Sequence, residues 1–258
     1  MVKLELNYKF TYMIYSKKNN LLYIAVPKTG TTSVERALLK IDPEAENHSL
    51  TVGDRMFKGR DLEKGILSHA RAKEIKKVVP EDFFNNLNIL GTIRDPKSKL
   101  VSAYFFSKKG KLIKSKYIKI SSFRLLINEV RFIAGMLMAR LLPFQIWAFL
   151  YPYRSNYDYI FDDKGNRLVP FVARTEYLES DLKLIFSKLD IDISKFELGI
   201  SNTSNHQHYL KYYENKLFNK LISKRMKKDN DLYKTVGVEI NKLGDEFSIA
   251  VKKNNGFV

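Results

Sequence analysis

Residues 21–40 read LLYIAVPKTGTTSVERALLK and carry the clearest structural pattern in the chain. An apolar run, Leu21–Val26, leads through Pro27 into the polar sequence KTGTTS. Apolar side chains then return at helical spacing, at Val34, Ala37, Leu38 and Ile41. The pattern predicts a buried strand, a tight loop and an amphipathic helix whose first turn carries hydroxyl groups.

The loop between this strand and helix is typical of an anion-binding site. Such a loop points backbone N–H groups at one place, with the positive end of the helix dipole behind them. Gly30 lets the backbone approach a ligand closely, and Lys28 adds a mobile positive charge. We predict that a phosphate group binds the residues of this loop, namely Lys28, Thr29, Gly30, Thr31, Thr32 and Ser33. The alternative is an ordinary turn capped by a threonine, because the loop lacks the G-x-x-x-x-G-K-[ST] and G-x-G-x-x-G patterns of nucleotide sites.

A second strand–turn–helix segment follows closely after residue 87. The segment Asn88–Ile93 predicts a strand, and Asp95 and Pro96 suit the cap and the first turn of a helix. Arg94 is then expected at the carboxyl end of the strand, with Ser102 along the helix. If both strands belong to a parallel sheet, the two loops open on the same edge, where ligands bind.

Other segments predict further elements of an α/β fold. Tyr159–Phe161 and Leu168–Val172 flank the turn sequence DDKGN and predict a hairpin. Glu179–Leu189 predicts an amphipathic helix, and Tyr209–Tyr233 predicts one long lysine-rich helix. His69 is expected to open a short helix between the two strand–turn–helix segments.

The composition is that of a folded protein with an excess of positive charge. The chain has 258 residues, 45% of them hydrophobic, and we predict a single domain over residues 1–258. Cys is absent, so disulfides and thiolate metal sites are excluded. Lys and Arg outnumber Asp and Glu by 45 to 28, a net charge of +17, which favours anionic partners. The alternative is a lysine-rich surface without a dedicated polyanion groove. No motif for specific nucleic-acid recognition is found in the sequence.

The sequence predicts no transmembrane segment. Residues 1–18 lack the apolar core and the cleavage site of a signal peptide, so we expect a cytoplasmic protein. Phe132–Tyr151 is strongly apolar, but Arg140, Pro143 and Gln145 interrupt it. We expect a pair of buried helices there, and peripheral membrane contact is the alternative.

Five segments, in order along the chain, resemble sulfotransferases that use 3′-phosphoadenosine 5′-phosphosulfate (PAPS). PKTGTTS, residues 27–33, resembles the loop that grips the 5′-phosphosulfate in that family. R-D-P-x5-S-x-Y, residues 94–104, resembles its 3′-phosphate motif. Three more segments resemble parts of bacterial and Golgi-type carbohydrate sulfotransferases: HARA at 69–72, FVARTEYL at 171–178 and NTSNHQHYLKYY at 202–213.

The resemblance implies both a fold and an activity. The implied fold is a P-loop-like, three-layer α/β fold with a central, mostly parallel sheet flanked by helices. The implied enzyme moves a sulfuryl group from PAPS to a hydroxyl acceptor, favouring a saccharide or glycan, and releases 3′-phosphoadenosine 5′-phosphate (PAP). Lys28 would stabilise charge on the leaving phosphate, and Arg94 and Ser102 would bind the 3′-phosphate. The scheme requires no metal.

Histidine is suited to take the proton of an acceptor hydroxyl near neutral pH, and the chain has four histidines. We predict His69 as this base because it lies between the two cofactor motifs and matches the H-A-x-A segment of the family. A surface or capping role for His69 is the alternative. His48 lies in a polar segment without other signals, and His206 and His208 are expected to pack or to contact the acceptor.

The sequence leaves other interpretations open. Arg174 is expected either to contact the substrate or to form a structural pair with Glu176. A nucleotide kinase or NTPase would use Lys28 and would need a magnesium-binding carboxylate after a strand, for which Asp95 is the candidate. A non-catalytic polyanion-binding protein is supported by the net charge of +17.

Overall fold

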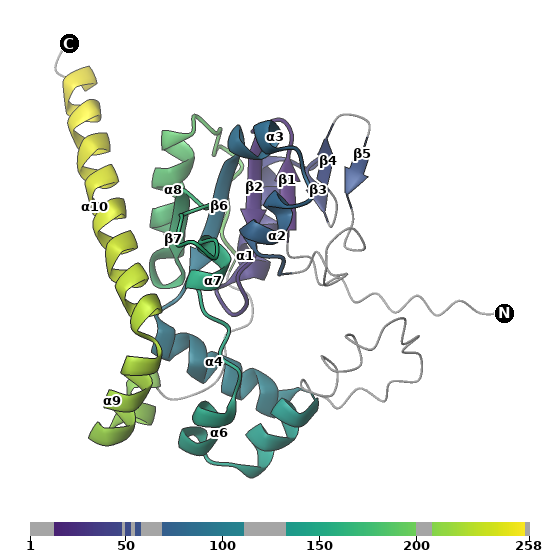
Figure 1. Ribbon diagram of the computed structural model, residues 1–258. Helices are drawn as coiled ribbons and strands as arrows, with labels where there is room; N and C mark the ends of the chain where they lie inside the picture. The colour runs from purple at the N-terminus through teal and green to yellow at the C-terminus, as the bar shows by residue number, and fades with distance from the viewer. Residues whose placement is uncertain are drawn as a thin grey trace. The chain divides into compact units, whose positions relative to one another are not determined.

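The computed structural model describes residues 13–47, 50–52, 55–57, 69–110, 133–199 and 208–255 (Figure 1). The chain divides into two compact units. Unit 1 takes its residues from 1–92, 159–173 and 182–201. Unit 2 takes its residues from 93–158, 174–181 and 202–258.

Unit 1 is built on an open sheet with the strand order β3-β1-β2-β6-β7. Its strands are β1 Met13–Ser16, β2 Leu21–Ile24, β3 Glu46–Asn47, β6 Asn88–Ile93 and β7 Phe171–Arg174. β2 and β6 pair in parallel, whereas β1 is antiparallel to both β2 and β3. Consequently β2, β3 and β6 point in one direction and β1 is reversed. A separate antiparallel pair joins β4 Leu50–Val52 to β5 Arg55–Phe57.

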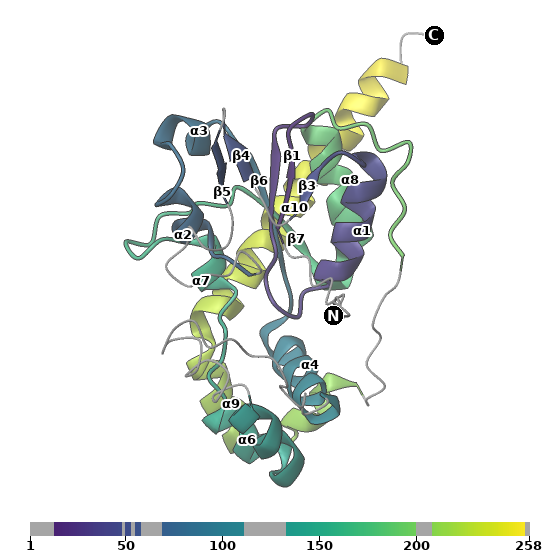
Figure 2. The same ribbon diagram turned by 90° about the vertical axis from the view of Figure 1, so that its right-hand side faces the viewer.

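Helices flank both faces of this sheet, so the α/β class is confirmed. Figure 2 shows α1 Thr31–Ile41 and α8 Leu178–Lys188 on one face and α2 Ala72–Lys76 and α3 Glu81–Asn85 on the other. The helices bury apolar side chains against the strands, including Val34, Ala37, Leu182, Ile185 and Phe186. The strands themselves are buried because they are covered on both sides.

The predicted hairpin after residue 158 is wrong in its first arm, and its second arm becomes a strand only from Phe171, in β7. Residues Tyr157–Ile160 form the helical turn α7, and only one bridge, between Phe161 and Arg167, joins the two arms. The reason lies in the turn, where the Asp162 carboxylate accepts the N–H groups of Lys164 and Asn166 at 2.9 and 2.8 Å. These local bonds close a tight turn without requiring strand pairing on either side.

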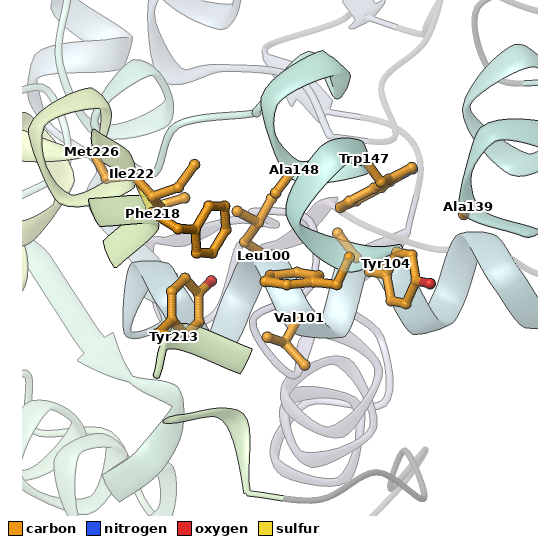
Figure 3. Close-up of a cluster of buried hydrophobic side chains, with 12 residues drawn as sticks. Leu100, Val101, Tyr104, Ala139, Trp147, Ala148, Tyr213, Phe218, Ile222 and Met226 are labelled. Carbon is orange, nitrogen blue, oxygen red and sulfur yellow. The ribbon is translucent and has the colours of Figure 1, made fainter. Parts of the chain in front are cut away.

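Unit 2 is helical and has an aromatic core. Its helices are α4 Pro96–Lys109, residues 133–141, α6 Phe144–Leu150, the 3₁₀ turn Tyr209–Tyr213, α9 Lys216–Arg225 and α10 Lys227–Asn255. Figure 3 shows side chains of α4, α6 and α9 meeting in one buried cluster. Tyr104 and Trp147 lie 5.2 Å apart between ring centroids, and Phe144 and Tyr213 lie 5.5 Å apart. Both pairs are edge-to-face, a favourable geometry for aromatic rings.

The long helix predicted over residues 209–233 is broken in the structure. Residues Tyr209–Tyr213 form a 3₁₀ turn, and α9 starts only after Asn215. The Asn215 side chain accepts the N–H of Phe218 at 2.9 Å, which is an N-cap. A second interruption at Met226 separates α9 from α10.

The predicted pair of helices in the apolar segment is present, but the expectation that the two helices are buried is wrong, because each exposes one apolar face. Residues 133–141 are helical, and α6 follows after Pro143. Both helices bury one face, with Met136 and Ala139 on the first and Trp147 and Ala148 on the second. Within the described part of the chain, no helix is long and apolar enough to cross a membrane.

Candidate functional site

The loop after β2 enters α1 through left-handed backbone. Lys28 has φ 67° and Gly30 has φ 76°, both in the region that favours glycine. Gly30 is the N-cap of α1, and its carbonyl accepts the N–H of Ser33 at 2.9 Å. Gly30 has no side chain, so the predicted alternative of a threonine cap is wrong. The first N–H groups of a helix, here those of Thr31 and Thr32, have no acceptor within the helix, which is the backbone arrangement that binds anions.

The Thr29 side chain belongs to the framework of the loop. Its hydroxyl donates to the Val26 carbonyl at 2.7 Å, so its contact with the Thr92 hydroxyl at 2.6 Å must be donated by Thr92. The Thr92 hydrogen is then used, and Tyr23 is the donor in its 3.0 Å contact with Thr92. All three side chains are fully buried. This chain of hydrogen bonds ties the loop to β6, and burial raises the pKa of Tyr23.

His69 is bound to the start of the same loop. Its Nδ1 lies 2.8 Å from the Ala25 carbonyl oxygen, immediately after β2. Because a carbonyl can only accept, Nδ1 carries the hydrogen, and the neutral ring then has its lone pair on Nε2. The expectation that His69 opens a helix is wrong, because His69 has φ 62° and α2 begins only at Ala72.

The segment after His69 is anchored on both sides. Ala70 and Ala72 are buried, and the N–H of Arg71 donates to the Glu74 carboxylate at 2.9 Å. The Arg71 guanidinium lies over the Tyr159 ring, 5.8 Å from its centroid. These contacts hold the backbone beside a strained residue, as a precisely placed side chain requires.

The turn after β6 has a different construction. β6 ends at Ile93, and the Asp95 carboxylate accepts the N–H of Ser98 at 2.9 Å, which caps α4 as predicted. Pro96 occupies the first turn of the helix. The Arg94 Nε donates to the Ser98 hydroxyl at 2.9 Å. Ser98 and Ser102 are four residues apart on α4 and therefore share one helix face with Arg94 at its end.

Ser98 is a residue of the candidate site that the sequence analysis missed. It contributes its N–H to the cap and its hydroxyl to Arg94. A signal was present, because Ser98 lies midway between Arg94 and Ser102 at helical spacing. Ser102 itself is buried, as is Ser98. Arg94, Ser98 and Ser102 together form a cluster of one guanidinium and two hydroxyls.

Glu176 lies beside this cluster. Its carboxylate accepts the N–H of Asp95 at 3.1 Å and the Tyr233 hydroxyl at 2.9 Å, and it lies 3.9 Å from the Arg94 Nε. Burial raises the pKa of Glu176, and burial also lowers the pKa of Arg94. The carboxylate therefore orients both the backbone and the guanidinium of the turn.

A buried polar network holds the backbone at Arg94. The Asn156 side chain donates to the Arg94 carbonyl at 2.9 Å and accepts from the Lys99 amine at 2.7 Å. Lys99 also donates to the Arg154 carbonyl at 2.7 Å. Burial lowers the pKa of Lys99 to about 7. Asp229, fully buried, accepts two backbone N–H groups and two hydroxyls from residues 153–157 and fixes the segment that carries Asn156.

Arg174 does not form the expected pair with Glu176. Its guanidinium binds Asp181 with two hydrogen bonds, of 2.8 and 2.9 Å, and lies over the Tyr177 ring. Asp181 is buried, and its interaction with Arg174 raises the pKa of Arg174. Arg174 therefore has a structural partner seven residues along the chain, at the start of α8.

The structure brings the predicted residues together in two groups. Lys28 to Ser33 and His69 belong to unit 1, whereas Arg94 and Ser102 belong to unit 2. Thr92, which Thr29 contacts, precedes Arg94 by two positions in the chain.

No described contact joins the remaining histidines to the β2 loop or to the Arg94 cluster. His208 is exposed, and its ring lies beside that of Tyr209, with 4.8 Å between the centroids and an angle of 35° between the planes. His48 and His206 lie outside the described residues.

Over the residues that the structure describes, no group of three or more His, Asp or Glu side chains is arranged to hold a metal ion. Comparisons of the chain with protein-family models, with curated proteins and with solved structures found no match.

Proposed function

We propose that this protein is a PAPS-dependent sulfotransferase with a P-loop-like fold, acting on a hydroxyl acceptor, with a saccharide or glycan as the favoured class. The proposal includes the whole chain as one sulfotransferase domain. It is supported by the five ordered segments that resemble the family. It is also supported by the local structure of the two turns that would hold the donor.

The observation that carries the proposal is the contact between His69 and Ala25. An imidazole that donates from Nδ1 to the carbonyl at the end of β2 is fixed beside the Lys28 loop, with Nε2 as its basic nitrogen. Both Lys28 and His69 have left-handed backbone, with φ 67° and 62°. Such strain costs about 1–3 kcal/mol per residue and is concentrated at functional sites.

The residues of the loop fit the charged end of such a donor. When bound, PAPS supplies a sulfuryl group already attached to a good leaving group, a phosphate. The N–H groups of Thr31 and Thr32 and the amine of Lys28 would stabilise the negative charge that grows on that phosphate. His69 would take the proton from the acceptor hydroxyl, so that the acceptor oxygen bonds to sulfur while the bond from sulfur to the phosphate oxygen breaks.

The cluster after β6 fits a second phosphate. Arg94 supplies a guanidinium, and Ser98 and Ser102 supply hydroxyl donors on one face of α4. A donor with phosphate at both the 3′ and the 5′ position of adenosine needs two separate anion sites. The two turns differ in construction but both suit that requirement.

The test combines a binding assay with a transfer assay. We expect PAP to raise the melting temperature of the full chain more than ATP with Mg²⁺ does. We expect labelled sulfate to pass from PAPS to at least one acceptor in a panel of saccharides, lipids, phenols and peptides. Stabilisation by ATP with Mg²⁺ alone would favour a kinase or NTPase. Salt-sensitive binding of many polyanions without transfer would favour a non-catalytic binding protein.

A further inference from the structure

Two consecutive helices of unit 2 expose apolar side chains along one face each. On the helix at residues 133–141 these are Ile133, Leu137 and Leu141, spaced four residues apart, and Leu141 is 80% exposed. On α6 they are Ile146, Phe149 and Leu150. The opposite face of α6 is occupied, since Trp147 and Ala148 point into the buried cluster in Figure 3. Packing in the core therefore does not explain why the other face of each helix is apolar.

α9 extends this surface and adds charge. Leu217 and Leu221 are exposed on one face of α9, and Lys220 and Lys224 lie on the same side at helical spacing. α6 contacts both of the other helices. Trp147 donates to the Gly135 carbonyl at 3.2 Å, and the Phe149 and Phe218 rings are 5.5 Å apart. We call the exposed apolar residues of these three helices the apolar face.

The charges on the three helices themselves all have one sign, and acids close by in the sequence, Asp158, Glu214 and Asp229, lie outside them. Residues 133–157 contain two charged side chains, Arg140 and Arg154, and no acid. Residues 215–228 contain no acid either, and their cations are Lys216, Lys220, Lys224, Arg225, Lys227 and Lys228. Lysine is depleted in the core of protein–protein interfaces, whereas aliphatic side chains flanked by lysines are typical of helices that lie on anionic membranes. Lysine stems can also cover apolar surface while the amines reach lipid phosphates.

We propose that the apolar face binds the surface of a membrane that contains anionic lipid, with Leu and Ile side chains inserted between headgroups. No helix in the described part of the chain is long and apolar enough to cross a membrane, so the contact we propose is peripheral. The proposal concerns unit 2 alone and does not depend on the sulfotransferase assignment. Membrane binding would bring the protein to acceptors displayed at a lipid surface.

The test is flotation of the full chain with vesicles of phosphatidylcholine alone and of phosphatidylcholine mixed with phosphatidylglycerol. We expect flotation with the mixed vesicles and much less with the neutral ones. Leu141→Asp and Leu150→Asp should each weaken binding by about tenfold or more, because each removes an inserted apolar side chain. Lys220→Gln and Lys224→Gln should each weaken it by about fivefold.

Matched controls separate this surface from the general charge of the protein. Val238 on α10 and Leu150 are both 56% exposed, so Val238→Asp should leave flotation unchanged. Lys234→Gln and Lys242→Gln remove the same charge from α10 and should likewise leave flotation unchanged. In a Leu141→Trp variant, brominated lipid should quench the new fluorescence, while the buried Trp147 of the parent protein should be quenched little.

Three outcomes would overturn the proposal. One is failure to float with either kind of vesicle. Another is flotation that responds to the lysine variants but not to Leu141→Asp or Leu150→Asp, which would indicate charge attraction only. The third is a concentration-dependent dimer that these apolar substitutions dissociate, without vesicle binding, which would make a second copy of the chain the occupant.

Discussion

The turns that follow the paired strands β2 and β6 enter their helices in different ways. After β2 the chain takes left-handed backbone at Lys28 and Gly30, and α1 has no side-chain cap. After β6 the chain passes into α4 with Asp95 as a side-chain cap and Pro96 in the first turn. The first turn therefore presents main-chain N–H donors. In the second turn, the Asp95 carboxylate already accepts an N–H group of the first helical turn.

If each turn binds a phosphate of the proposed donor, the two turns would do so in different ways. At the first turn the helix terminus itself would bind the anion, because the Gly30 cap gives its first N–H groups no side-chain acceptor. At the second turn Asp95 already takes the N–H of Ser98, so positive charge must come from a side chain, Arg94. Arg94 in turn depends on neighbours that hold it, chiefly Ser98 and Asn156. The first site depends on backbone conformation, and the second depends on a side-chain network.

The largest expected effect is at His69, which would make the β2 turn the place of chemistry. His69→Ala should lower sulfate transfer by about a hundred- to ten-thousandfold, the usual range for a general base, and leave PAP affinity unchanged. His69→Asn tolerates the left-handed backbone and should lose as much activity, which separates chemistry from folding. His208→Ala is the control and should keep full turnover. Near-normal transfer by His69→Asn would contradict the assignment.

Substitution of Lys28 should have the second-largest effect on sulfate transfer, and it tests the role of the backbone in the same turn. Lys28→Ala should slow transfer by about a hundred- to thousandfold, equivalent to ~2.7–4 kcal/mol of lost charge stabilisation. Lys28→Gly should lose the same activity but be more stable than Lys28→Ala by about 1 kcal/mol, because glycine accepts φ 67° without strain. Urea unfolding of the two variants measures this. Equal stability would show that the left-handed backbone carries no strain.

Arg94 tests the side-chain site of the comparison. Arg94→Ala should weaken PAP binding by about ten- to a hundredfold, since a hydrogen bond to a charged group is worth ~1.5–3 kcal/mol. Isothermal calorimetry measures the affinity. Arg36→Ala removes the same charge from an exposed position on α1 and should have little effect. Unchanged affinity in Arg94→Ala would assign the second phosphate to other residues.

Lys99 makes the stability of the second site depend on pH. Its pKa is lowered from 10.5 to about 7, so above pH 7 the unfolded chain binds more protons than the native protein. The free energy of unfolding of the parent protein, relative to Lys99→Met, should therefore rise from pH 7 to about 10.5. Below pH 7 the native protein carries the full cost of the buried charge. The free energy of unfolding of the parent protein is therefore lowest there relative to Lys99→Met. If the difference in free energy of unfolding between the two proteins does not change with pH, the Lys99 pKa is not lowered by burial.

The smallest effects compare the two caps directly. Asp95→Ala should cost about 1 kcal/mol of stability through loss of the cap. Gly30→Ala should cost about 1–2 kcal/mol because an alanine is strained at φ 76°. Gly30→Asn should cost less than Gly30→Ala, since asparagine tolerates left-handed backbone. If the two Gly30 variants are equally stable, left-handed backbone is not the reason that this position requires glycine.

Local patterns predicted several elements well because the deciding interactions lie within a few residues. The strand Asn88–Ile93 was predicted with its exact bounds, and the helix after it has the predicted cap at Asp95. α8 lies within one residue of its predicted range. In each case an apolar period or a cap residue fixes the backbone without help from distant segments.

The errors occur where distant contacts or competing local bonds decide. His69 was expected in a helix, but its ring is bound to Ala25, 44 positions earlier in the chain. Arg174 was expected beside Glu176, yet Asp181 binds it instead, and Glu176 turns to the backbone of Asp95. Periodicity cannot indicate such partners, because it records only which face of an element is apolar.

The sequence by itself determined that this chain has a strand, a loop and a helix at residues 21–41, and a second such segment leading to Arg94 and Ser102. It did so because glycine, proline and apolar spacing restrict the backbone locally. Only the tertiary structure decided that Thr29 bonds to Thr92, that His69 donates its Nδ1 hydrogen to the end of β2, and that Asn156 holds Arg94. Those contacts join residues far apart in the chain, and buried polar groups select their partners from whatever the fold brings within hydrogen-bond distance.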